Sequence, residues 1–250
     1  VSHLVLATSN TERVSDFLSN FSYRNLFYNV KNRNPNEKEL FIKGPLARST
    51  TTTLMTVENN WPPFELLKEN DNQTGSAMNM SPSPIRALIE VDEGHHDEST
   101  IQKIVNFQDR DDPIMNFYGI NNKMSTDKTL ALAIPCYDLK DALDFWEFIG
   151  FNPYIENNLA RVSIKKTIVG RPLSLYFLTQ TRRTSKMWLN QEGIVCISFL
   201  CNDAKKICDE LELKGYEVGE CFNLKPFNRA LKIFFMRNHS GEIYEFLSSN

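Results

Sequence analysis

The chain has 250 residues, of which 41% are hydrophobic, so it has enough apolar material for one large core or two smaller ones. Its formal net charge of −3 excludes the basic surface of a dedicated nucleic-acid binder. Five cysteines without a CxxC motif argue against a disulfide framework, and no apolar run approaches the roughly 18 residues of a membrane span.

The first half opens with an apolar run, His3–Thr8, that predicts a strand. Ser9 and Glu12 have the spacing of a capping box, which predicts that a helix starts here. Further strands are predicted at Asn25–Val30, Glu39–Lys43 and Thr50–Val57. Residues 61–83 are rich in Asn, Pro, Ser and Gly and predict a long loop. A shortened strand, helix and strand are predicted at Ile85–Val91, Glu98–Phe107 and Ile114–Tyr118.

The second half repeats a strand, a helix and two or three further strands. Asp138 and Asp203 each stand where a helix N-cap is needed, and Gly150 and Gly215 stand where those two helices should end. The predicted strands are Leu130–Ile134, Leu159–Ile164, Pro172–Leu178, Ile194–Leu200, Ala230–Met236 and Glu242–Leu247. This internal repeat of about 60 residues indicates an α+β fold made of tandem modules.

The chain divides near residue 125. We therefore predict one domain at 1–125, which contains the loop 61–83, and a second domain at 126–250. The composition also favours a reducing compartment, either the cytoplasm or, if a targeting segment has been removed, an organelle matrix. We expect no nucleic-acid or membrane partner, and the oligomeric state is left open.

Four segments resemble the vicinal oxygen chelate superfamily, which contains glyoxalase I, bleomycin-resistance proteins and extradiol dioxygenases. They are SHLVLATSNTERVSDFL (2–18), LALAIPCYDLKDALDFWEFIGF (130–151), NDAKKICDELELKG (202–215) and MRNHSGEIYEF (236–246). The resemblance implies βαβββ modules that pair into open, cup-shaped mixed sheets. It also implies a divalent metal in the cup that chelates two adjacent substrate oxygens.

The resemblance places candidate metal ligands at four positions. His3 falls on the first-strand position and Glu245 on the last-strand position, where it would be a ligand or the catalytic base. Cys196 falls on the fifth-strand position. The remaining position falls near Thr56, with Glu58 two residues on and therefore on the same strand face.

The second ligand set is degraded, because its positions hold Ala131, Phe177 and residues near Arg86 and Asn116. One metal site at most is therefore expected. It would form if the first module pairs with the fourth, and would be lost if each half of the chain closed on itself. We expect either one divalent metal, zinc or iron, or none.

Two further positions bear on activity. Ala7 and Pro135 stand where glyoxalase I has an arginine that holds glutathione, so lactoylglutathione lyase activity is not expected. Three functional hypotheses stay open. The first is a binding or regulatory pseudo-enzyme whose cup holds a small molecule or a protein partner. The second is a metal-dependent lyase, isomerase or dioxygenase, and the third is a protein-interaction module that uses loop 61–83.

Overall fold

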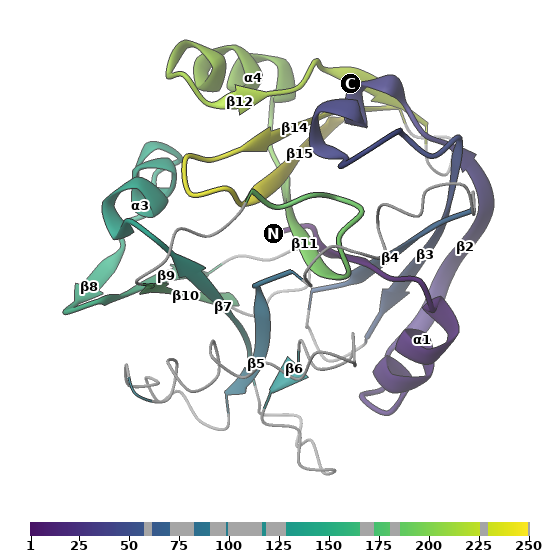
Figure 1. Cartoon of the computed structure of the whole chain (residues 1–250), viewed down its shortest axis with the longest axis horizontal. Coiled ribbons are helices and arrows are strands. Elements are labelled where there is room, and N and C mark those ends of the chain that lie inside the picture. The colour runs from purple at the N-terminus through teal and green to yellow at the C-terminus, as the bar shows by residue number, and fades with distance from the viewer. Residues whose placement is uncertain are drawn as a thin grey trace.

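The computed structural model describes residues 1–57, 62–70, 83–90, 99, 117–118, 129–165, 173–180, 186–225 and 230–249. In these residues the strands form two sheets (Figure 1). The larger sheet has nine strands in the order β12-β14-β15-β11-β1-β4-β3-β2, with β13 paired to β14. The smaller sheet has six strands, in the order β6-β5-β7-β10-β9-β8.

The strands of the larger sheet come from both ends of the chain. They are β1 (His3–Ala7), β2 (Arg24–Arg33), β3 (Ser49–Thr56), β4 (Phe64–Glu69), β11 (Gly193–Leu200), β12 (Glu217–Val218), β13 (Phe222–Leu224), β14 (Leu231–Arg237) and β15 (Ile243–Ser249). Those of the smaller sheet are β5 (Arg86–Glu90), β6 (Phe117–Tyr118), β7 (Thr129–Cys136), β8 (Tyr154–Glu156), β9 (Leu159–Ile164) and β10 (Leu173–Thr179).

Each module follows one plan. Its first strand pairs in parallel with its last strand, as β1 does with β4, β7 with β10, and β11 with β15. The first strands of two modules then pair antiparallel, β1 with β11 and β5 with β7. The first module therefore shares a sheet with the fourth, and the second with the third. Each sheet takes strands from both sides of the sequence division near residue 125.

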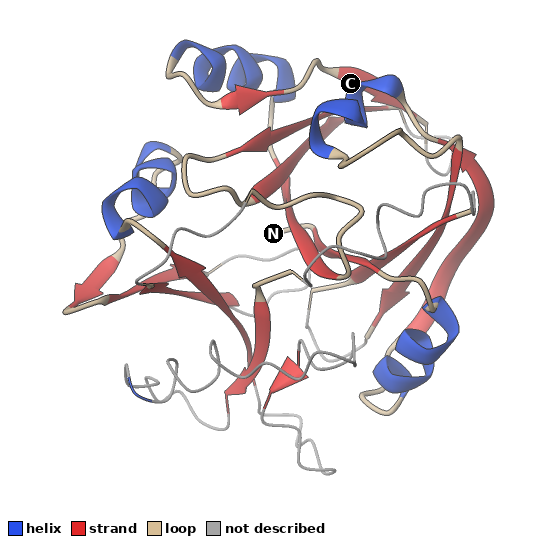
Figure 2. Cartoon of the chain, viewed as in Figure 1, coloured by secondary structure: helices blue, strands red, loops and turns tan. Residues whose placement is uncertain are grey.

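Among the described residues, the α-helices lie outside the two sheets (Figure 2): α1 (Thr11–Ser19), α3 (Leu139–Phe148) and α4 (Ala204–Leu213). The side chains of Asp138 and Asp203 cap α3 and α4 as predicted. Gly150 and Gly215 follow these helices with φ of 91° and 82°, a conformation that favours glycine. None of the described helices is long and apolar enough for a transmembrane span.

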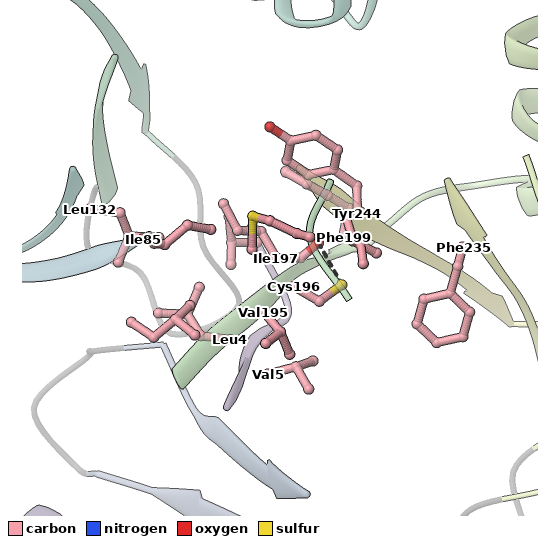
Figure 3. Packing of buried hydrophobic residues seen from close by; sticks show 14 of the residues in the cluster. Leu4, Val5, Ile85, Leu132, Val195, Cys196, Ile197, Phe199, Phe235 and Tyr244 are labelled. Atoms are coloured by element: carbon pink, nitrogen blue, oxygen red, sulfur yellow. Dashed lines mark hydrogen bonds between the residues drawn. The ribbon is translucent and has the colours of Figure 1, made fainter. Parts of the chain in front are cut away.

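The main core lies between the sheets. Figure 3 shows Ile85 and Leu132 of the smaller sheet facing Leu4 and Ile197 of the larger one. Helix α3 joins both sheets through its aromatic residues. Phe145 stacks on Tyr244 at 4.4 Å between ring centroids, and Trp146 contacts Phe177 and Tyr244. Because neighbouring side chains of a strand point to opposite faces, His3 and Glu245, which adjoin Leu4 and Tyr244 in sequence, point to the other face of the larger sheet.

Three predicted elements were wrong. The capping box at Ser9 is replaced by Asn10, whose side chain accepts from the Arg13 N–H, because the Ser9 N–H is already bound to Glu192. Glu39–Lys43 is not a strand but belongs to the 3-10 turn η1 (Asn36–Phe41) and the residues after it. The loop predicted at 61–83 contains β4, a strand hidden between polar and proline-rich flanks. The predicted helix Glu98–Phe107 and most of Ile114–Tyr118 lie outside the described residues.

The η1 segment departs from a strand because its side chains pack against the fourth module. Phe41 is fully buried, with its ring 5.9 Å from that of Phe235 and the Arg237 guanidinium 5.2 Å above it. The carbonyl of Phe41 also accepts from the Leu189 N–H at 2.8 Å. Tertiary packing therefore overrides the strand-like pattern of these residues.

We predict that Phe41→Ala lowers the free energy of unfolding by about 3–5 kcal/mol, because it leaves a cavity where a fully buried aromatic ring stood. Urea denaturation measures the change. Leu40→Ala is the matched control, since Leu40 is exposed, and it should shift stability by no more than about 0.5 kcal/mol. Equal effects of the two substitutions would show that η1 is not anchored through Phe41.

Candidate metal centre

The strand register brings four polar side chains together on one face of the larger sheet. His3 on β1 lies opposite Ser198 on β11, and Ser198 lies opposite Glu245 on β15. On the other side of β1, Glu65 of β4 pairs with Val5, which shares the His3 face. We call this the cup face, defined by His3, Glu65, Ser198 and Glu245.

His3 is at the centre of this group. Its Nε2 lies 3.0 Å from Oε2 of Glu65 and 3.3 Å from Oε2 of Glu245. One atom from each of the three side chains falls within 4.8 Å of the other two, the one such group among the described residues. The other ring nitrogen, Nδ1, is 3.1 Å from the Ser2 hydroxyl, so the ring is oriented with Nε2 toward the carboxylates.

The spacing of this group fits a shared cation. Two donor atoms that each lie about 2.1 Å from one ion are roughly 3.0–3.4 Å apart in octahedral or tetrahedral geometry. The two measured distances at Nε2 fall in this range. The side chains are also reachable from solvent, with exposed fractions of 15% for His3, 23% for Glu65 and 8% for Glu245.

Without a cation, a proton on His3 holds the same group together. Burial works against the charged imidazole, but the ion pairs with Glu245 and Glu65 raise the pKa of His3 to about 10. Burial likewise opposes the charge on Glu65, yet His3 and the nearby Lys38 lower the pKa of its carboxyl. A metal ion would bind Nε2 in place of that proton.

Ser198 orients Glu245 and is not itself one of the three donor side chains. Its hydroxyl donates to Oε2 of Glu245 at 2.7 Å and is fully buried. Ser198 and Glu245 stand on the first and last strands of the fourth module, as His3 and Glu65 do in the first. The two modules therefore contribute equivalent pairs of strands, but only one of the two first strands carries a histidine.

Cys196 lies on the same strand face as Ser198, two residues away, and is fully buried. Its sulfur is outside the group of atoms that lie within 4.8 Å of one another. Burial, with the charges of Glu245 and Glu65, raises the pKa of this thiol well above its ordinary value. The structure thus brings together His3 and Glu245 of the predicted ligands and leaves Cys196 beside them.

At the fourth predicted ligand position the structure differs from the prediction. Thr56 ends β3, whereas the carboxylate that reaches His3 is Glu65 of β4. Glu58 lies outside the described residues. Glu65 was missed because the composition of 61–83 masked a six-residue strand. The alternation of apolar and polar residues in this strand could have revealed Glu65, since Phe64 and Leu66 are buried and Glu65 points to the opposite face.

The smaller sheet holds no equivalent group among its described residues. Ala131 and Ala133 share one face of this sheet with Tyr176. Phe177 points to the opposite face and packs in the main core, so the prediction that Phe177 lies on the ligand face was wrong by one residue. The Arg86 guanidinium donates to backbone carbonyls of Ser83 and Ile85. Asn116 lies outside the described residues.

Glu242 stands at the end of the last turn and is buried. It is 2% exposed, and burial raises the pKa of its carboxyl to about 7. The Asn238 side chain closes this turn by accepting from the N–H groups of Gly241 and Glu242. The turn therefore fixes the start of β15 and with it the position of Glu245.

Comparison with known proteins identifies the fold. No family model matches the sequence, and no curated protein matches it. The structure is similar to that of a "putative dioxygenase" from Bacillus subtilis, with a TM-score of 0.59 and 13% identity over 100% of this chain and 84% of that one. It is also similar to a glyoxalase I mutant from Zea mays, with a TM-score of 0.57 and 13% identity over 99% and 91%. These likenesses confirm the predicted α+β fold of tandem modules, the fold of the glyoxalase I structure.

We predict that the contribution of His3 to the stability of the metal-free protein depends on pH. Since its folded pKa is above the unfolded value of 6.5, the contribution is complete below pH 6.5 and is lost as pH rises through about 10. Urea denaturation of wild type and His3→Asn, with a chelator present, should show a difference in unfolding free energy that shrinks between pH 6.5 and 10. A constant difference would contradict a charged His3.

Proposed function

We propose that the protein binds one divalent cation through His3, Glu65 and Glu245 and acts on a small molecule with two adjacent oxygen atoms. The observation that carries this proposal is the convergence of three donor side chains from β1, β4 and β15 at the spacing of one coordination shell. These residues come from both ends of the chain, so the fold itself has to assemble the group.

The donor set suits a fairly hard cation. Two carboxylates favour manganese or magnesium, whereas the imidazole favours zinc or iron, so manganese, iron or zinc fits the mixture best. A set that included the Cys196 thiol would have favoured zinc more strongly. Three protein ligands leave coordination positions open, as in catalytic metal sites.

Proton transfer is the reaction class that this group supports best. A bound divalent cation would polarise two adjacent substrate oxygens and so acidify a hydrogen on the neighbouring carbon. Glu245 would accept that proton, since Ser198 fixes one of its oxygens and aligns the carboxylate. One histidine with two carboxylates departs from the two histidines and one carboxylate typical of iron oxygenases. We therefore favour a lyase or isomerase over a dioxygenase.

Glutathione is not favoured as part of the substrate. The positions at which an arginine would hold it are Ala7 in β1 and Pro135 in β7, both buried in the sheets. Neither side chain can make a charge-assisted hydrogen bond to a carboxylate.

A second candidate is a metal-free binding protein. It is supported by the His3 ion pairs, since a protonated His3 satisfies Glu65 and Glu245 without a cation. In that case the cup would hold a small molecule or a partner segment with no chemistry. An interaction role for 61–83 has less support, because Phe64 at its start is buried within β4 and Trp61 lies outside the described residues.

Metal content of the purified untagged protein decides between these candidates. We predict about one equivalent of manganese, iron or zinc by elemental mass spectrometry after dialysis. His3→Gln, Glu65→Gln and Glu245→Gln should each lose it, because each removes one of three ligands. Cys196→Ala is the matched control and should keep the metal. A folded wild-type protein that binds none of these ions would establish the metal-free alternative.

We predict that Ser198→Ala weakens metal binding by about 10- to 100-fold, the usual effect of removing a group that orients a ligand. The physical reason is the loss of the hydrogen bond that holds Glu245 in place. Competition with a fluorescent chelator measures the affinity. An unchanged affinity in this variant would mean that Glu245 is positioned by its strand alone.

A further inference from the structure

The η1 segment packs against the fourth module on the side of the cup face. The Lys43 N–H donates to Oδ1 of Asn190 and its carbonyl accepts from Nδ2, both at 3.1 Å. At Gly219 an added Cβ would come within 2.9 Å of the Phe41 ring and 3.4 Å of the Glu37 carbonyl. Together with the burial of Phe41, these contacts fix the backbone of η1 against the sheet.

Lys38 is the residue of η1 that reaches the cup face. Its ammonium group lies 5.4 Å from the centre of the Phe235 ring. Phe235 is directly opposite Glu245 in the pairing of β14 with β15, so the two side chains share one face. The positive charge of Lys38 also acts on Glu65. Lys38 therefore stands beside the three donor residues without being one of them.

The charges of this site do not balance. The two carboxylates of Glu65 and Glu245 neutralise a doubly charged cation, and a His3 bound through Nε2 adds no charge. The ammonium group of Lys38 then adds one positive charge that the other groups of the site do not neutralise. Among the described residues it makes no salt bridge that would cancel this charge.

We propose that Lys38 selects a substrate that carries one negative charge beside its two adjacent oxygens, such as a small 2-oxo or 2-hydroxy carboxylate. This inference rests on the proposed metal site. The ammonium group would bind the carboxylate oxygen that does not face the cation, a charge-assisted hydrogen bond. The fixed backbone of η1 limits the positions that this ammonium group can reach before the substrate arrives, which reduces the entropic cost of binding.

Oxamate and oxamide provide matched probes, because they have the same shape and adjacent oxygens but oxamate carries one negative charge and oxamide none. Both are titrated calorimetrically into manganese-loaded protein. Lys38→Met should weaken oxamate binding by roughly 10- to 100-fold and leave oxamide binding unchanged. Lys38→Arg keeps the charge and should retain most of the oxamate affinity.

Two controls separate this role from a structural one. Lys43→Met makes the same change of charge at an exposed residue two positions after η1 and should leave both probes unaffected. Lys38→Met should also bind manganese as tightly as wild type or more tightly, since removing a positive charge lessens repulsion of the cation.

Equal losses for oxamate and oxamide in Lys38→Met, or no loss for either, would overturn the role of Lys38 while the metal site stood. A wild-type protein that binds no manganese, iron or zinc would overturn the proposed function and, with it, the proposed substrate class.

Discussion

The antiparallel pairing of β1 with β11 is the interaction on which the rest of the structure depends. It joins the first module to the fourth and makes one sheet from the two ends of the chain. The same register sets His3 opposite Ser198, and the next pairing sets Ser198 opposite Glu245. Had each half of the chain closed on itself, His3 and Glu245 would stand in different sheets. The candidate site therefore exists because of the order in which the strands pair.

The two faces of the larger sheet carry different side chains. One face carries Leu4, Tyr244 and their neighbours into a dry aromatic core shared with α3. The other face carries the carboxylates, whose burial would be costly without a partner of opposite charge. His3 supplies that partner in the absence of a metal. The period of two residues along each strand places both sets of side chains on the same strands.

The sequence predicted much of this, and its failures have identifiable physical causes. The resemblance named His3 and Glu245 as candidate ligands, and the strong patterns around them predicted the strands β1 and β15 in which they lie. Cys196, the candidate on β11, shares the face of Ser198 because two residues separate them, so hydrophobic alternation cannot distinguish these two positions. Glu65 was hidden by polar residues on either side of a short strand. The η1 segment was misassigned because its conformation is set by Phe235 and Arg237, which are about 200 residues away in the chain.

The same long-range pairing has a consequence for how the protein is made. During synthesis β1 and β4 are made long before β11, so the place of β1 between β4 and β11 stays incomplete until β11 has been made. The smaller sheet, whose strands lie between residues 86 and 179, can close earlier. Until β11 has been made, the edge of β1 that pairs with it is exposed and could pair with another chain.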